Sequence, residues 1–156
     1  MHIAINISIR VTSLAGQSWS NIGYNCNMSH VEPDQTVMNA MRAADPDEPV
    51  TMLNLLRFRE RALPGCGVDE MSGRDAFWRY GALNHEAGVQ YASKPVWLGS
   101  AHRTVIGDED WDLAILVSYP TRQHFIDKLA DPKYQEIAKV RSAALADSRL
   151  IELTQP

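Results

Sequence analysis

The stretch "VTMLNLLRF", residues 50–58, is a predicted strand whose two faces are both apolar. Alternate side chains of a strand point to opposite faces. One face carries Met52, Leu56 and Phe58, and the other carries Leu53 and Leu55. A strand of this kind indicates a sheet that is covered on both sides. We therefore expect the elements before and after this strand in the sequence to pack on the faces of the sheet.

Helices are predicted on both sides of this strand in the sequence. A helix over 33–44 is stopped by the prolines of "DPDEP" at 45–49. A second helix begins at Ser72, which forms a capping-box pattern with Asp75, and continues to about residue 88. Gly81 lies on the face of this helix that should meet the sheet. Glycine lowers helix propensity, so its presence predicts a close contact between helix and sheet there.

The remainder of the chain predicts a hairpin, two helical segments and a final strand. The elements are a strand over 94–107, a strand over 111–119, a helix over 121–129, a helical segment that begins at Asp131-Pro132, and a strand over 148–154. The turn Gly107–Asp110 joins the first two strands. In the last helical segment, the stripe of Tyr134, Ile137 and Ala138 continues to Arg141, which places a permanent charge on a core-facing side.

The order from residue 50 is strand, helix, strand, strand, helix, strand. This order predicts an α+β, ferredoxin-like βαββαβ domain with an antiparallel sheet, together with an extra helix. The helices cover one face of such a sheet and leave the other face bare. Several side chains expected on the bare face are apolar, so we expect a second copy to cover it. The sequence thus predicts a homodimer through the sheet faces.

Residues 1–30 differ from the rest of the chain. "HIAINISIRV" alternates as a strand does, and a polar stretch rich in Ser, Asn and Gly follows it. Two interpretations remain open: an added edge strand with a loop, or an appendage outside the fold, which we favour slightly. We therefore expect an N-terminal extension over 1–30 and a ferredoxin-like domain over 31–156.

Composition excludes several classes of function. The 156-residue chain has a net charge of −4 and scattered basic residues, which argues against nucleic-acid binding. No apolar run reaches the ~18 residues of a membrane helix, and no basic region precedes the first apolar stretch, so neither a membrane span nor a secretory signal is expected. Cys26 and Cys66 are interpreted as reduced thiols of a cytoplasmic protein. Histidine spacing predicts no metal site, and no cofactor is expected.

Four stretches resemble a known family. They are "PVTMLNLLRFRERA", "SGRDAFWRYG", "PVWLGSAHRTVIG" and "WDLAILVSYPTRQHFIDKLADPKYQEIAKVRSAALADSRLIEL". Over about residues 33–153 the chain is similar to family 1330 of the domains of unknown function, and Tyr134-Gln135 followed by Arg141 matches the C-terminal helix signature of that family. The resemblance implies a dimeric α/β barrel. That superfamily contains cofactor-free monooxygenases, lactone isomerases, haem-binding enzymes and proteins of no known reaction, so the resemblance implies fold more firmly than activity.

Six residues are candidates for the wall of a small-molecule site: Asn54, Tyr80, Trp97, Asp112, Tyr134 and Arg141. They place polar groups or a large ring within otherwise apolar elements. Each also has a structural interpretation. Asp112 is a candidate for an ion pair with Arg103 or for a position facing water, Arg141 for a partner of Asp147, and the others for hydrogen-bonded or packed core residues.

Two functions are compatible with this set. The first is a site for a small organic acid or aromatic ligand between sheet and helices; whether it is catalytic is left open, and the family resemblance implies oxygenation or isomerisation as the reaction if it is. The second is a homodimer that binds a metabolite or another protein, or has a structural role, and catalyses no reaction. The sequence contains no Ser-His-Asp arrangement, phosphate loop or usefully spaced carboxylate pair, so it predicts no particular catalytic residue.

Overall fold

The computed structural model describes residues 30–155, and the strand expected near the N-terminus lies outside them. The helices are α1 (Gln35–Ala43), α2 (Gly73–Gly88), α3 (Arg122–Ala130) and α4 (Pro132–Ala144), with a short 3₁₀ turn, η1 (Val89–Tyr91). The strands are β1 (Val50–Phe58), β2 (Lys94–Ser100), β3 (Leu113–Tyr119) and β4 (Leu145–Leu153). The sheet has the order β2-β3-β1-β4, and all its pairs are antiparallel. This is the expected ferredoxin-like α+β fold.

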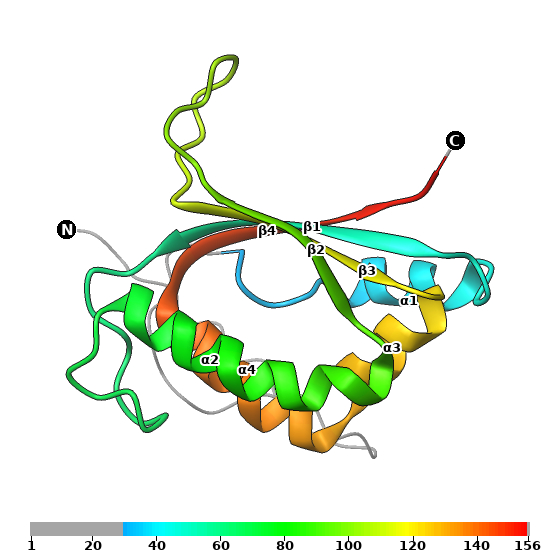
Figure 1. Cartoon of the computed structure of the whole chain (residues 1–156), viewed down its shortest axis with the longest axis horizontal. Helices are drawn as coiled ribbons and strands as arrows, with labels where there is room; N and C mark the ends of the chain where they lie inside the picture. The colour runs from blue at the N-terminus through cyan, green and yellow to red at the C-terminus, as the bar shows by residue number, and fades with distance from the viewer. Residues whose placement is uncertain (1–29, 156) are drawn as a thin grey trace, which may run out of the picture.

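The helix boundaries follow from their caps. Ser72 accepts a hydrogen bond from the backbone N–H of Asp75, as the capping-box pattern predicted. Thr121 caps α3, and Asp131 caps α4 immediately after α3 ends. The two helices therefore meet at a sharp break beneath the sheet (Figure 1).

Two layers result, with the core between them. Helices α2 and α4 lie side by side below the sheet, and α3 continues the same layer (Figure 1). Met52 and Leu56 of β1, and Leu113 and Tyr119 of β3, are buried against this layer. The strand predicted over 50–58 has those bounds, and its Met52–Leu56 face is the buried one.

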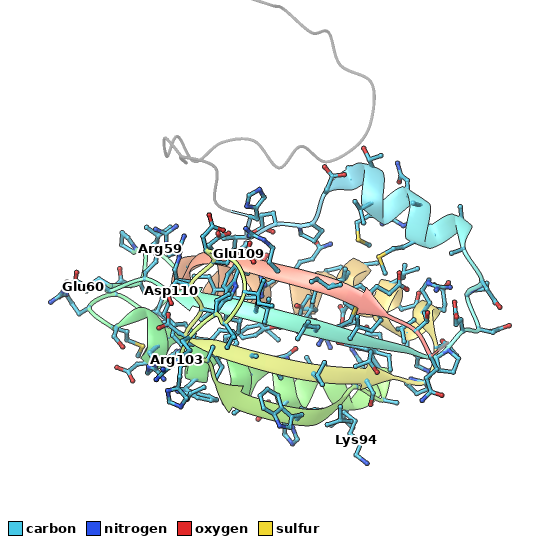
Figure 2. All side chains as sticks on the ribbon, turned by 90° about the horizontal axis from the view of Figure 1, so that it is seen from above. Arg59, Glu60, Lys94, Arg103, Glu109 and Asp110 are labelled. Carbon is cyan, nitrogen blue, oxygen red and sulfur yellow. The ribbon has the colours of Figure 1, made fainter. Side chains whose placement is uncertain are left out.

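The other side of the sheet, here called the bare sheet face, carries an apolar set that no element among residues 30–155 covers (Figure 2). The strand register places these residues opposite the buried face: Leu53, Leu55, Trp97, Ala114, Leu116, Ile151 and Leu153. Trp97, Ile151 and Leu153 are 52%, 43% and 39% exposed. The single chain therefore has the apolar, uncovered sheet face that the sequence predicted.

Three strand predictions were wrong in length. The strand expected over 94–107 ends at Ser100, and the one expected over 111–119 begins at Leu113. Residues 101–112 instead leave the sheet near the point where β1 ends at Phe58, and they rise above it (Figure 1). The last strand begins at Leu145 rather than at residue 148, directly after α4. No helix in residues 30–155 is long and apolar enough to cross a membrane.

The reason given above for Gly81 was also wrong. A Cβ atom built on Gly81 would meet nothing within 4 Å. The close approach occurs at Gly73, at the start of the same helix, where a Cβ would lie 2.3 Å from the carbonyl oxygen of Arg59 and 2.5 Å from that of Ala144.

Candidate functional site

Two of the six predicted site residues meet beneath the sheet. Tyr80 of α2 and Tyr134 of α4 are 7% and 8% exposed, and their hydroxyl oxygens lie 3.1 Å apart in a hydrogen bond. Burial raises the pKa of Tyr80 well above its usual range. The neighbouring Tyr134 adds to the increase, and the positive charge of Arg141 works against it. The phenol of Tyr80 therefore stays protonated and can donate a hydrogen bond.

A lysine that the sequence did not single out lies beside this pair. Lys128 of α3 is 4% exposed, and its Nζ donates a hydrogen bond of 3.2 Å to the hydroxyl of Tyr119. The same nitrogen lies 4.8 Å from the ring centroid of Tyr134 and 5.6 Å from that of Tyr119. Among residues 30–155 no carboxylate lies within ion-pair distance of Lys128. We call Tyr80, Tyr119, Lys128 and Tyr134 the Lys128 cluster.

Burial has a large effect on the charge of this lysine. The loss of water around its amine, followed by repulsion from Arg141, lowers the pKa of Lys128 to about 8. The ammonium form still predominates at neutral pH, and within residues 30–155 its charge is compensated only by a phenol and by the faces of two rings. The cluster thus combines a buried positive charge with phenol hydroxyls, which are groups of the kind that bind a carboxylate.

The local sequence explains how Lys128 becomes buried. It follows Phe125 by three residues, so both side chains lie on the helix face that packs under the sheet. Tyr119 ends the buried face of β3, and the break at Asp131-Pro132 turns α4 so that Tyr134 meets the same place. Sequence reasoning missed Lys128 because lysines are rarely buried. Its spacing from Phe125 was the available signal.

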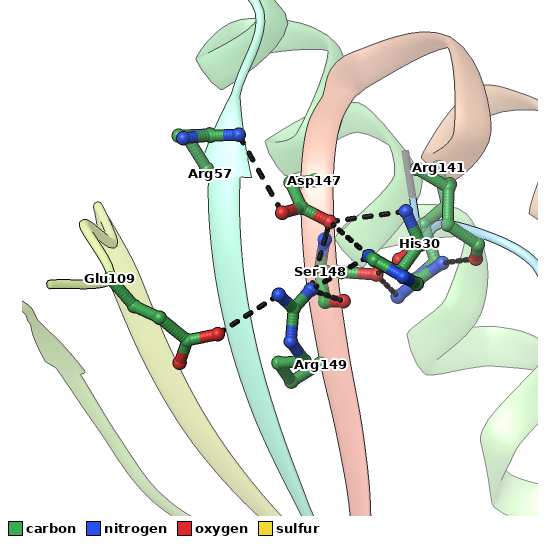
Figure 3. A network of polar contacts seen from close by, with 8 residues as sticks. His30, Arg57, Glu109, Arg141, Asp147, Ser148 and Arg149 are labelled. Atoms are coloured by element: carbon green, nitrogen blue, oxygen red, sulfur yellow. Dashed lines mark hydrogen bonds and ion pairs between the residues drawn. The ribbon is translucent and has the colours of Figure 1, made fainter. Parts of the chain in front are cut away.

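Arg141 holds two segments together at the edge of this region (Figure 3). Its guanidinium donates to the carbonyl of Val31 at 2.8 Å and to the hydroxyl of Ser148 at 3.1 Å. The predicted pairing with Asp147 was wrong, because that carboxylate is engaged by Arg149 at 3.0 Å and Arg57 at 3.6 Å instead. Arg141 affects the Lys128 cluster through its charge, as the pKa of Lys128 shows.

The structure does not bring the other three candidates into the cluster. Asn54 donates its amide to the carbonyl of Met52 at 3.2 Å within β1. Asp112 precedes β3, and its carboxylate accepts the backbone N–H of Phe58 at 2.7 Å, so it joins two strands rather than pairing with Arg103. Trp97 lies on the bare sheet face, on the opposite side of the sheet from Lys128.

The described residues contain no arrangement that could hold a metal ion. Within 30–155 no group of three or more His, Cys, Asp or Glu side chains converges on one point. The cluster itself offers phenols and an amine, which are groups suited to an organic ligand rather than to a divalent cation.

Comparison with known proteins gives a family but no activity. Residues 68–153 match the model of the family described as "Domain of unknown function (DUF1330)". The crystal structure of RPA0582, a protein of unknown function from Rhodopseudomonas palustris, is 37% identical, with a TM-score of 0.75, and the match covers 83% of this chain and 98% of that one. A structure of methylated RPA0582 is 36% identical, with a TM-score of 0.76, over 82% and 96% of the two chains. No curated protein matches the chain.

Proposed function

Because the chain belongs to the family described as "Domain of unknown function (DUF1330)", we propose its function from the Lys128 cluster: it binds a small organic acid, in particular an aromatic one, between the sheet and its helices. The observation that carries the proposal is a lysine that is 4% exposed and has no carboxylate partner among residues 30–155. A buried charge without a counter-ion is costly. The carboxylate of a ligand would supply that counter-ion.

The neighbours of Lys128 favour an aromatic acid. The hydroxyls of Tyr80 and Tyr134 are bonded to each other and leave one O–H free to donate, and two aromatic rings lie beside the amine. A ligand carboxylate would accept hydrogen bonds from the ammonium and a phenol, while its ring would pack on the tyrosine faces. Arg141 adds a positive charge that attracts the same kind of ligand.

Catalysis is the further form of this proposal that the family resemblance suggests. A cofactor-independent oxygenase or isomerase would hold the acid with the Lys128 ammonium and use the buried phenols of Tyr80 and Tyr134 to donate a proton or a hydrogen bond. The alternative is a binding protein that leaves its ligand unchanged. Chromatography coupled to mass analysis of the acid after incubation distinguishes the two, since an oxygenase changes the mass of the ligand, an isomerase changes its retention time, and a binding protein changes neither.

Isothermal titration with benzoate and with benzamide, its neutral analogue, tests the binding site at pH 7. We expect benzoate to bind and benzamide to bind at least tenfold more weakly, because only benzoate carries the counter-charge. Lys128→Met should abolish the preference. Lys133→Met is the matched control, since this lysine is exposed on α4 and should leave binding unchanged. Equal affinities of the wild type and Lys128→Met for benzoate would contradict the proposal.

We also propose that two copies pack through their bare sheet faces to form a homodimer. The apolar side chains of that face support this assembly, because an isologous pair covers the same patch on both subunits. Sedimentation equilibrium of the wild type should give twice the chain mass. Leu116→Asp, in the centre of the face, should give a monomer, and Leu83→Asp on the exposed side of α2 should not. A cytoplasmic location and the division at residue 31 stay predictions.

A further inference from the structure

Residues 101–112, here called the β2–β3 arm, rise from the sheet on the side away from α2 and α4 (Figure 1). Val105 and Ile106 lie at its tip and are 89% and 93% exposed. No other large apolar side chain among residues 30–155 is as exposed as these two. The arm therefore presents an apolar tip on the same side of the molecule as the bare sheet face.

Polar contacts hold the arm in place. The carboxylate of Glu109 lies 2.9 Å from the guanidinium of Arg149 on β4, and Arg149 also lies over the ring of Trp111, 5.0 Å from its centroid. The hydroxyl of Thr104 donates to the carbonyl of Glu109 within the arm. These contacts fix the base of the arm above the sheet (Figures 2 and 3) and leave its tip without cover from the described part of the same chain.

The area of the bare sheet face can be compared with the area that a typical dimer interface buries. Four strands of seven to nine residues span roughly 19 Å by 25 Å, a projected area of roughly 500 Å². A stable interface usually buries about 800 Å² on each partner. The accessible area of its side chains is somewhat larger than this flat projection, so the sheet face alone would give an interface near the small end of the usual range, and the arm adds apolar surface on the same side of the molecule.

We propose that the β2–β3 arm is a dimerisation arm, and that Val105 and Ile106 at its tip pack on the partner subunit. The inference rests on the sheet-face dimer proposed above and adds the element that enlarges it. A second copy is the occupant that the geometry favours, because the tip and the bare sheet face lie on one side of the molecule and can be buried by one partner (Figure 1).

Sedimentation equilibrium of the full chain tests the arm. In the double variant Val105→Ser/Ile106→Ser we expect the dissociation constant of the dimer to rise by about tenfold or more, because two apolar side chains lose their burial. The control is Val37→Ser/Val89→Ser, which replaces two residues that are 57% and 70% exposed on α1 and η1. The control should dimerise as the wild type does.

The possible outcomes separate the arm from the dimer. An arm variant that dimerises as tightly as the wild type would overturn the inference and leave the sheet-face dimer intact. A wild type that is monomeric at all concentrations would overturn both. Circular dichroism of each variant verifies the fold, and the high exposure of Val105 and Ile106 means that the folded monomer should tolerate serine at both positions.

Discussion

The hydroxyl oxygens of Tyr80 and Tyr134 lie 3.1 Å apart beneath the sheet, although 54 residues separate them in the sequence. Each hydroxyl is buried, and each is a hydrogen-bond partner of the other. The pair links α2 to α4 at the edge of the Lys128 cluster. Its energetic coupling is therefore a direct measure of whether the cluster is formed as the structure shows.

Removing either hydroxyl alone should lower the free energy of unfolding by more than half of what removing both hydroxyls costs. Tyr80→Phe and Tyr134→Phe should each lower the free energy of unfolding by about 1–2 kcal/mol, because each leaves the other buried hydroxyl with one partner fewer. The double variant should lose less than the sum of the two. Urea unfolding of all four proteins gives the coupling energy. Strictly additive losses would show that the two hydroxyls do not interact.

The charge of Lys128 should make stability depend on pH. Its pKa is about 8 in the folded state and 10.5 in the unfolded chain, so the unfolded state binds the extra proton between these values. The destabilisation is therefore complete below pH 8 and is lost as the pH rises to 10.5. Between pH 7 and 9.5 the wild type should gain about 2 kcal/mol relative to Lys128→Met.

Chemical denaturation of both proteins at several pH values measures this difference. Comparing the two cancels the contribution of Tyr80 and Tyr119, whose raised pKa values act on both proteins at higher pH. A difference in unfolding free energy that stays constant from pH 7 to 9.5 would show that Lys128 is not desolvated in solution.

The sequence predicted the elements whose ends carry strong local signals. The strand over 50–58 begins after a proline and is apolar on both faces, and its observed bounds are the same. Ser72 was predicted as a cap and Thr121 and Asp131 as helix starts, and all three cap their helices, because side-chain capping depends on residues within one turn. Local sequence signals were therefore enough to predict these elements. The order of the elements along the chain was then enough to predict the fold.

Features that depend on tertiary contacts were not predictable in the same way. The β-branched residues Val105 and Ile106 favoured a strand, but the sheet offers no neighbour at that position. Asp112 was a candidate acid, and its use as an acceptor for Phe58 depends on a strand 54 residues earlier. The helical spacing of Tyr80 and Tyr134 was enough to place both on core-facing sides, while their role in a site stays a prediction. Lys128 was missed because its burial is set by packing between α3 and the sheet.

A buried arginine should contribute strongly to stability. Arg122 of α3 is 4% exposed, and its guanidinium lies 2.6 Å from both Glu48 and Glu152. Arg122→Met should lower the free energy of unfolding by about 2–4 kcal/mol, because it leaves two partly buried carboxylates without their partner. Urea unfolding measures the loss.

An exposed ion pair of similar length provides the control for Arg122. Arg61 lies 2.7 Å from Glu70, but the two side chains are 70% and 88% exposed. Water already solvates both charges, so Arg61→Met should leave stability unchanged within error. Similar losses for Arg122→Met and Arg61→Met would mean that burial does not determine the strength of these pairs.

Two glycines of α2 should respond to alanine in opposite directions. At Gly73 the new Cβ would lie 2.3 Å from the carbonyl of Arg59 and 2.5 Å from that of Ala144, and both are backbone atoms that cannot rotate away. Gly73→Ala should lower the free energy of unfolding by about 2–3 kcal/mol. At Gly81 the space around the Cβ is open, so Gly81→Ala should raise it by about 0.5–1 kcal/mol through helix propensity. Thermal unfolding of both variants tests the start of α2, since a Gly73→Ala protein as stable as the wild type would mean that α2 does not approach Arg59 and Ala144 this closely.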